Sequence, residues 1–486
     1  MTKFLHGSEV LEIDDGVRSI ATVRTAVIGL AFASSFAAPA VGSSLSIGSV
    51  ALNDAITLTS IDTGNQTNAI GFSIAHPSEA SAALTVTVAD NIITVSLATN
   101  EQSVATSTAT EIVQAITDSS EASALVVAKI SGGTGSEVPE PLATRYFTGG
   151  KDEPFPVNQP VLITGSVKQA EGMGVKSSAY QTVSNIMKQT GALVVAVRAT
   201  SSSEGDIIKA IGAFSDARSL VGYKPRILIA PEHSHLDGVG KELEVQAERL
   251  RGFAYLDCEL TATYTDAMKR ARMYGKRVEI QWPQLKVIDP DTSVEKPRPT
   301  SEFAAGLRCR IDNEKGVHWS KSNQEIFGIV GTWQPVQWEL SDPNTVANIL
   351  NENRVSTVIL DGGFRFWGNR SCSIDLKWSF ECVRRTADMI NDSIESAHLW
   401  AVDRPGTTQY MQDVIGGVQA YMKQLKFEGV IPGGDAWLDK DLNTPETMAL
   451  GIYYFDYDFG VYYPAEHLVF RSRLNNGYLE EVVANV

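Results

Sequence analysis

The stretch 193–230, LVVAVRATSSSEGDIIKAIGAFSDARSLVGYKPRILIA, decides the fold class of this chain. An apolar run at 193–197 is followed by a helical pattern at 206–213 and then by a second apolar run at 227–230. Short apolar runs bounded by turn residues are typical of strands that are buried on both faces of a sheet. Their alternation with a helix predicts an α/β layer with a largely parallel sheet.

The same alternation continues on both sides of this stretch. Further apolar runs occur at 161–164 and 278–280, with helical patterns between them. We therefore expect an α/β domain over residues 148–345. Residues 21–37 are predicted to join it, because the segment from Val23 onward has the apolar character of a buried strand.

Residues 38–147 differ in composition from the rest of the chain. Ala, Ser, Thr and Val dominate, and Lys129 is the only basic residue between Arg24 and Arg145. β-Branched runs, a turn at 89–91 and one amphipathic segment predict a small β-rich acidic domain. The compositional breaks at both ends indicate that it is inserted into the α/β domain and faces outward. Its expected strands are 55–59, 84–88 and 92–97, and its expected helix is 107–116.

The ends of the chain are predicted to be extended arms. Residues 1–20 and 468–486 contain alternating apolar positions but too few of them to form a core. A strand without a local partner can pair with the sheet of another molecule. The positions expected to carry this pairing are Val10, Leu11, Ile13, Tyr478, Leu479, Val482 and Val483.

Charge argues against nucleic acid as a partner. The chain of 486 residues has 41 Lys and Arg against 57 Asp and Glu, which gives a formal net charge of −16. A polyanion is repelled by such a molecule, and no cluster of basic and aromatic residues reverses this locally. A membrane span is not expected either. The uncharged stretch 25–53 is interrupted by Gly29, Pro39 and Gly42, and the N-terminus is acidic where a signal peptide is basic.

Cysteine usage indicates a reducing site of assembly. The four cysteines are scattered and form no C-x-x-C pair, so we interpret them as reduced, partly buried thiols. A disulfide formed after release from a cell stays an alternative. The residues are Cys258, Cys309, Cys372 and Cys382.

Catalytic and metal-binding patterns are weak. Lys151 follows two glycines but precedes Asp152, so the phosphate-loop pattern fails. His233 and His235 follow an expected strand end, with Glu232 and Asp237 close in sequence, but a third ligand at a recognisable spacing is missing. A hydrogen-bonded loop is the preferred interpretation. We therefore predict no catalytic residue, no metal site and no cofactor, and expect that the chain is not an enzyme.

Several phrases, in order along the chain, resemble the contractile tail sheath proteins of myophages and R-type bacteriocins. The most specific is Gly362-Gly363-Phe364-Arg365-Phe366-Trp367-Gly368-Asn369-Arg370. The N-terminal segment 1–36 and residues from about 150 to the end are covered. The other matching phrases are 6–10, 24–29, 318–323, 385–394, 434–439, 443–446, 454–458 and 464–468.

The resemblance implies a structural subunit that polymerises helically around a tail tube. Such a sheath contracts without nucleotide hydrolysis and drives the tube through a host envelope, while the terminal arms keep neighbouring subunits linked. Implied partners are further copies of the chain, the tail tube protein, and the baseplate and tail terminator proteins. The implied location is the tail of the virion, after assembly in the host cytoplasm. Residues 346–467 are expected to form an inner C-terminal domain that faces the tube.

Within the most specific phrase, which includes Phe364 as part of the structural motif, Phe366 and Trp367 are expected in the core and not at an interface, since buried aromatics are the commoner case. Arg365 and Arg370 are expected to form buried ion pairs. Three alternatives stay open at this point. They are a tube or baseplate protein of the same particle, a metal-dependent α/β hydrolase using His233 and His235, and an adhesion protein, which the missing export signal disfavours.

Overall fold

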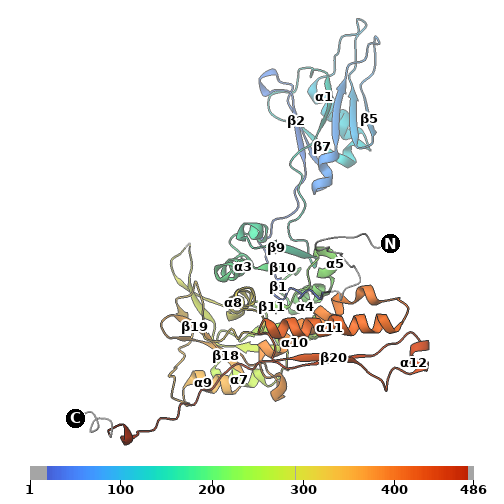
Figure 1. Cartoon of the computed structure of the whole chain (residues 1–486). Coiled ribbons are helices and arrows are strands. Elements are labelled where there is room, and N and C mark those ends of the chain that lie inside the picture. Colours follow the sequence, from blue (N-terminus) through green and yellow to red (C-terminus); the bar gives the residue numbers. More distant parts are fainter. Residues whose placement is uncertain (1–18, 291, 480–486) are drawn as a thin grey trace, which may run out of the picture.

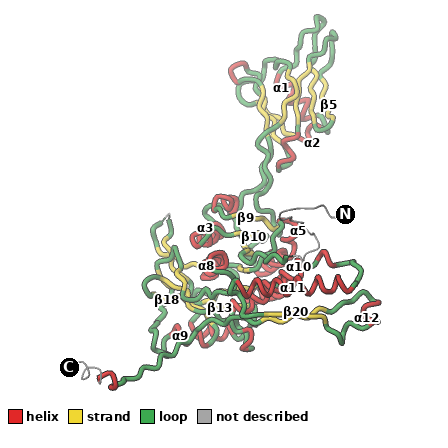
Figure 2. Tube along the Cα trace, viewed as in Figure 1, coloured by secondary structure: helices red, strands yellow, loops and turns green. Residues whose placement is uncertain are grey.

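The computed structural model describes residues 19–290 and 292–479. The chain forms a body built on one large sheet, a C-terminal layer of helices beside it, and a small domain that projects from the body on a narrow linker (Figure 1). Helices are concentrated in the body and the C-terminal layer, whereas the projecting domain is mostly strand and loop (Figure 2). The mixed α/β class and the multidomain organisation predicted from the sequence are confirmed.

The body is organised around a nine-stranded sheet. Its strands are, in sheet order, β16 (Gln324–Glu325), β19 (Phe364–Trp367), β18 (Val355–Leu360), β13 (Val278–Gln281), β12 (Phe253–Asp257), β11 (Ile227–Ile229), β1 (Val27–Phe32), β10 (Leu193–Arg198) and β9 (Pro160–Thr164). The strands from β18 to β10 run parallel, and β9, β19 and β16 are antiparallel to their neighbours. The largely parallel sheet is therefore as predicted.

Strand β1 lies inside this sheet, between β11 and β10, although it precedes the insertion in the sequence. Ile28 is in register with Val194 on one side and with Ile227 on the other. All six residues of β1 are buried. Two parts of the chain separated by the insertion therefore share one core.

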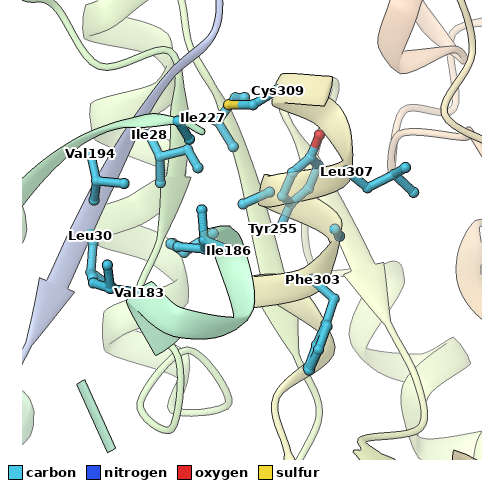
Figure 3. Packing of buried hydrophobic residues seen from close by; sticks show 14 of the residues in the cluster. Ile28, Leu30, Val183, Ile186, Val194, Ile227, Tyr255, Phe303, Leu307 and Cys309 are labelled. Atoms are coloured by element: carbon cyan, nitrogen blue, oxygen red, sulfur yellow. The ribbon is translucent and has the colours of Figure 1, made fainter. Parts of the chain in front are cut away.

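Helices cover both faces of the sheet, as expected for parallel strands. Ile28 and Leu30 of β1 point toward the face of Val183, Ile186 and Phe303, as the close view shows (Figure 3), whereas Ala31 points to the opposite face. Each such buried aliphatic side chain contributes roughly 1.5–3 kcal/mol. The first face is covered by α3 (Ser178–Gln189) and α8 (Thr300–Glu314), the second by α4 (Glu204–Gly212), α5 (Ala217–Val221), α6 (Asp237–Leu250), α7 (Tyr264–Ala271) and α9 (Val346–Glu352).

The expected domain boundary between residues 345 and 346 needs correction. Helix α9 and strands β18 and β19 follow that position, yet they belong to the sheet of the body. Val355 is fully buried against the same core as the preceding strands. Parallel pairing of β18 with β13 makes these residues part of the α/β layer, which ends only after Trp367.

The C-terminal layer begins with α10 (Glu381–Ala397) and α11 (Thr408–Phe427), which pack against each other. A hairpin of β20 (Gly434–Leu438) and β21 (Phe455–Phe459) lies beside them, and α12 (Pro445–Ala449) is part of its connection. A smaller sheet at the edge of the body has the order β15 (Glu295–Arg298), β14 (Leu285–Ile288) and β17 (Gly331–Thr332).

The inserted domain has its own core between two sheets and a helix. Asp90 and Asn91, both with positive φ, form the two-residue turn between β5 and β6, so the predicted hairpin is confirmed. Thr108 and Glu111 cap the helix reciprocally at its start. The elements are β2 (Ser44–Ile47), β3 (Ile56–Ser60) and β7 (Val126–Ile130) in one sheet, β5 (Thr85–Ala89), β6 (Ile92–Ser96), β4 (Gly71–Ala75) and β8 (Leu142–Tyr146) in the other, with α1 (Ala109–Asp118) and α2 (Ala122–Leu125).

Within residues 19–290 and 292–479, no helix is both long enough and apolar enough to cross a membrane.

Candidate assembly surfaces

Residues 19–26, here called the N-terminal strap, cross the C-terminal helices before the chain enters β1. Ile20 is only 4% exposed and lies in the core formed by α10 and α11. The backbone N–H of Val23 donates to Ser393 Oγ on α10 at 3.0 Å. The strap therefore fastens the C-terminal layer to the body.

The β20–β21 hairpin is a two-stranded antiparallel sheet with open edges. Among the residues that the structure describes, neither strand has a second strand partner. An unpaired edge presents a row of backbone donors and acceptors to another chain. Both edges are therefore candidates for addition of a strand from outside.

The two faces of this hairpin differ in chemistry. Ala436, Tyr457 and Phe459 point toward α11 and its core. Asp435 lies opposite Asp458 on the other face, as strand alternation requires. Within β21, Asp456 and Asp458 therefore share one face, and Phe455, Tyr457 and Phe459 share the other.

An apolar pocket of about 300 Å³ lies between the end of α10, the start of α11 and the hairpin. Val402 is 62% exposed and marks its mouth. Two carboxylates, Glu395 and Asp456, also border it. Apart from His398, the remaining lining is aliphatic and aromatic, with Tyr410, Val414, Ile415, Phe455 and Tyr457 among the wall residues.

The C-terminal tail, residues 460–479, leaves the body as an extended segment (Figure 1). Its first half is held near the start of α10, where Tyr463 packs against Phe380 with ring centroids 6.3 Å apart. Glu466 pairs with Arg370 at the same place. Beyond Glu466 every described side chain is exposed.

The arm positions predicted from the sequence are only partly described. Tyr478 and Leu479 are 70% and 64% exposed beside a 3-10 turn at Asn476–Tyr478, so they form no strand in the isolated chain. Pairing with another molecule stays a prediction. Val10, Leu11, Ile13, Val482 and Val483 lie outside the described residues.

A buried charge network joins α10 to the sheet. Lys321 Nζ lies 2.6 Å from Glu279 Oε2 on β13 and also contacts Glu381 on α10. Tyr255 on β12 donates its hydroxyl to Glu381. All four side chains are buried, so one amine is shared between two carboxyl groups that have no access to water.

Burial and neighbouring charges shift the pKa values of this network in opposite directions. Burial, followed by the proximity of Glu381, raises the pKa of Glu279 to about 7, against the attraction of Lys321. Burial also opposes ionisation of Glu381, but Lys321, Arg308 and Arg385 outweigh it and lower the pKa of that carboxyl. Glu381 is therefore the ionised partner near neutral pH, and Glu279 is the one that titrates.

A second buried pair lies one turn further along α10. Arg385 Nη2 lies 2.6 Å from Asp312 Oδ2, and Arg308 Nη2 lies 2.8 Å from Asp312 Oδ1. Two cations on one buried carboxylate lower the pKa of Asp312 although burial opposes its ionisation. Together with the pair of Arg277 and Asp388, these pairs hold α10 against α8 and the start of β13.

The phrase Phe364–Arg370 is structural, but its arginines differ from the expectation. Phe366 is fully buried, whereas Trp367 is half-buried and packs on Trp338, with ring centroids 5.6 Å apart. Phe364 is partly buried against the core. Arg365 donates to the carbonyl oxygens of residues 361 and 323 instead of a carboxylate. The Arg370–Glu466 pair is partly exposed, because both side chains lie at the surface where the tail leaves.

The turn that contains His233 and His235 is a hydrogen-bonded loop after β11. Ser234 Oγ lies 3.0 Å from the buried carboxylate of Asp257, to which it donates. Burial lowers the pKa of His233. In the described part of the chain, no group of three or more His, Cys, Asp or Glu side chains is arranged to hold a metal ion.

Sequence reasoning missed the charge network and the pocket. Glu279 in the apolar run Val278–Ile280 was a usable signal, because a carboxylate within a buried strand needs a partner. Lys321 belongs to one of the matching phrases but gives no such signal by itself. The pocket could not be found from sequence, since its walls come from three separate elements.

Comparison with known proteins identifies two family models on this chain. The phage tail sheath protein central domain matches residues 170–372, and the phage tail sheath C-terminal domain matches residues 373–475. The junction of the two models at 372/373 follows the end of the nine-stranded sheet.

The matches to curated proteins cover most of the length of each relative. A putative prophage major tail sheath protein of Pseudomonas aeruginosa (strain UCBPP-PA14) is 36% identical over 352 residues, covering 69% of this chain and 91% of that protein. The tail sheath protein of Escherichia phage P2 is 32% identical over 355 residues, covering 69% and 89%.

Solved structures agree at the level of the fold. The PVC sheath complex of an extracellular contractile injection system, in the contracted state, matches with a TM-score of 0.53 and 16% identity, covering 67% of this chain and 89% of that chain. The helical sheath of the anti-feeding prophage, also contracted, matches with a TM-score of 0.52 and 17% identity, covering 65% and 89%. Neither the hydrolase nor the adhesion alternative receives support from these matches.

Proposed function

The chain belongs to the phage tail sheath family and is a structural subunit of a contractile tail, and we propose that its terminal arms link it into a helical sheath around a tail tube. On contraction, the subunits slide as rigid bodies while the arms keep the lattice connected. The tube is thereby driven through the host envelope. Free energy comes from new contacts between subunits, summed over many copies, and the proposal includes no nucleotide hydrolysis, catalytic step or cofactor.

The observation that carries this proposal is the combination of an open hairpin with an unpartnered tail. The edges of β20 and β21 can accept a strand, and residues 467–479 extend from the body with every side chain exposed. A chain that donates one strand and accepts another can form an open polymer, because each added subunit still offers a free strand or a free edge. The N-terminal arm, with Val10, Leu11 and Ile13, is proposed to act in the same way.

The shape of the molecule supports an orientation in the sheath. The inserted domain projects from one end of the body, and the C-terminal layer lies along the side of the body, away from that domain (Figure 1). We place the C-terminal layer on the inner, tube-facing side and residues 38–147 on the outside, because the projecting domain needs free space around it. Since β18 and β19 belong to the sheet, the inner part is 373–467 and not all of 346–467.

The proposed partners are other copies of the chain, the tail tube protein, the baseplate and the tail terminator. Nucleic acid is not among them, since the net charge of −16 repels a polyanion. Assembly in the host cytoplasm is supported by the four free, buried cysteines, which suit a reducing compartment.

Negative-stain electron microscopy of the purified full-length chain at high concentration tests the proposal. Hollow helical tubes of uniform width are expected. Monodisperse particles at every concentration would contradict self-assembly by the arms, since the chain carries both the donor and the acceptor of each link.

A further inference from the structure

Strand β5 of the inserted domain is an unprotected sheet edge. It ends the four-stranded sheet, and within the described residues it pairs only with β6. Its sequence Thr-Val-Thr-Val-Ala contains no charge and no proline, and its register with β6 is regular. Asp90 is the only ionisable residue from position 80 to position 100. Natural proteins normally block such an edge, because its free backbone groups pair with other chains.

The other three sheet edges of the same domain are protected. At the opposite end of the same sheet, β8 contains Arg145, follows Pro141 and has an irregular register with β4. Strand β7 contains Lys129. Strand β2 has only four residues, and its first residue, Ser44, is bridged to Thr148. Charge, proline, bulges and short length all keep an edge from pairing, and β5 has none of these devices.

The side chains of β5 are complementary to a second copy of the same strand. Val86 and Val88 pack against the core of the domain, whereas Thr85 and Thr87 are exposed on the outer face. An antiparallel copy centred on Thr87 places threonine opposite threonine and Val86 opposite Val88. The valines then continue the inner face and the threonines continue the outer face. Such cross-strand pairs stabilise a sheet, and no charge opposes this one.

The free backbone groups of β5 fit the same register. Ala89 lies opposite Ile92 beside the two-residue turn, where a hairpin closes on a hydrogen-bonded pair. Because the hydrogen-bonding direction alternates along a strand, Val86 and Val88 direct their N–H and C=O groups away from β6. These are the two residues that lie opposite each other in the antiparallel pair. Thr87 then faces its own copy in the closer, non-hydrogen-bonded position.

We propose that β5 of one copy pairs antiparallel with β5 of a second copy, on a two-fold axis through Thr87, and that this contact joins neighbouring sheaths side by side. The inference rests on the proposed function, which places the inserted domain on the outside. Strand β5 lies along one side of that projecting domain (Figure 1). In a helical sheath, copies are related by a rotation with a translation and not by a two-fold axis. The two strands of this isologous contact therefore come from different sheaths.

The strength of the contact depends on the number of copies. A single pair of short strands is marginally stable in water, so free subunits meet only transiently through β5. A sheath presents many copies of the same edge, and the weak contacts of two parallel sheaths add. Side-by-side association is therefore expected of the polymer more than of the free subunit.

Disulfide trapping in the full-length chain tests the register. Thr87→Cys places two thiols opposite each other, at a separation that suits a disulfide. Thr85→Cys is the matched control, because it is exposed on the same face of the same strand but its two copies lie about 13 Å apart in this register. The native cysteines are buried, which keeps the background low. On non-reducing gels we expect about tenfold more dimer from Thr87→Cys, since a disulfide excludes the longer separation.

Equal amounts of dimer from the two variants, or no dimer from Thr87→Cys, would overturn the inference. The measurement does not need polymers, so it is separate from the test of the proposed function. Dimers without tubes would contradict self-assembly by the arms and not the strand contact. Tubes without dimers would contradict the strand contact and not the self-assembly.

Electron microscopy of the tubes tests the association of sheaths. Wild-type tubes should lie side by side in bundles. Thr87→Lys should give single tubes, because it places like charges directly opposite each other in the pair. Thr144→Lys, at an exposed position of the protected edge strand β8, is the control and should bundle as the wild type does. Wild-type tubes that stay single, or Thr87→Lys tubes that bundle equally, would overturn the role in joining sheaths.

Discussion

Lys321 and Glu279 form a fully buried ion pair, with Nζ 2.6 Å from Oε2, in which the lysine also contacts Glu381. Glu279 belongs to the sheet and Glu381 to the first turn of α10. One amine therefore connects the α/β body to the helix that carries the C-terminal layer. In a lattice that changes shape, such a connection keeps the subunit a rigid body while the contacts between subunits change.

Replacing Lys321 by Met should destabilise the body severely. The substitution takes the contacting cation from the buried carboxyl of Glu279 and leaves Glu381 with Arg385 at 4.0 Å. Breaking a buried pair in this way costs about 3–5 kcal/mol. Urea unfolding followed by tryptophan fluorescence measures it, because all eight tryptophans lie outside the inserted residues 38–147. Lys269→Met, at a side chain 74% exposed and paired with Asp266, should change stability by less than about 1 kcal/mol. Equal stability of the two variants would show that the buried pair is dispensable.

Glu279 should make stability depend on pH. Its folded pKa of about 7 lies above the ordinary 4.5, so the folded chain binds the extra proton and is stabilised by it at low pH. This contribution is complete below about pH 4.5 and is lost as pH rises toward 7, by up to roughly 3 kcal/mol. Glu279→Gln removes the titration. Unfolding free energies measured from pH 5 to 8 should fall more steeply in the wild type than in the variant, and parallel curves would contradict the shift.

The cysteine thiols should be unreactive toward thiol reagents in the folded protein. All four are buried, and burial raises the pKa of each thiol, in Cys258 to about 12. Because the thiolate is the reactive form, Ellman's reagent should label no thiol in native protein and four after unfolding in denaturant. Labelling of a thiol in the native state would show an opening of the core that the packing does not predict.

Much of the fold could be predicted from local sequence patterns. The apolar runs of the α/β layer and the hairpin at Asp90–Asn91 were predicted because strand period and turn chemistry are encoded within a few residues. The end of the sheet was not, because β18 pairs with β13 through residues far apart in sequence. For the same reason Arg370 was expected in a buried pair, although its partner Glu466 comes from the exposed tail. The pocket depends on tertiary packing throughout.

Excision of the inserted domain should leave a competent sheath subunit. Val41 and Lys151 form an antiparallel bridge, with N–H to carbonyl distances of 2.9 and 3.0 Å in the two directions. An Asn-Gly turn in place of residues 42–150 can therefore close the chain without disturbing β1 or β9. We expect stability by tryptophan fluorescence within about 1 kcal/mol of the wild type, since the two cores are separate, and normal tubes by electron microscopy. Folded chains that no longer assemble would assign the domain a place in the lattice instead of an outward one.

Removal of the N-terminal arm should abolish assembly and leave folding unchanged, provided that the truncation ends at residue 18. Ile20 lies in the core of α10 and α11, so a deletion that includes it removes packing as well as the arm. The single change Ile20→Ala should by itself cost roughly 2–5 kcal/mol. The chain that starts at Ser19 keeps the strap, and we expect wild-type stability by tryptophan fluorescence, a monomer by size-exclusion chromatography and no tubes. Wild-type tubes from this truncation would mean that the C-terminal tail alone links the subunits, since the strap and the body are unchanged.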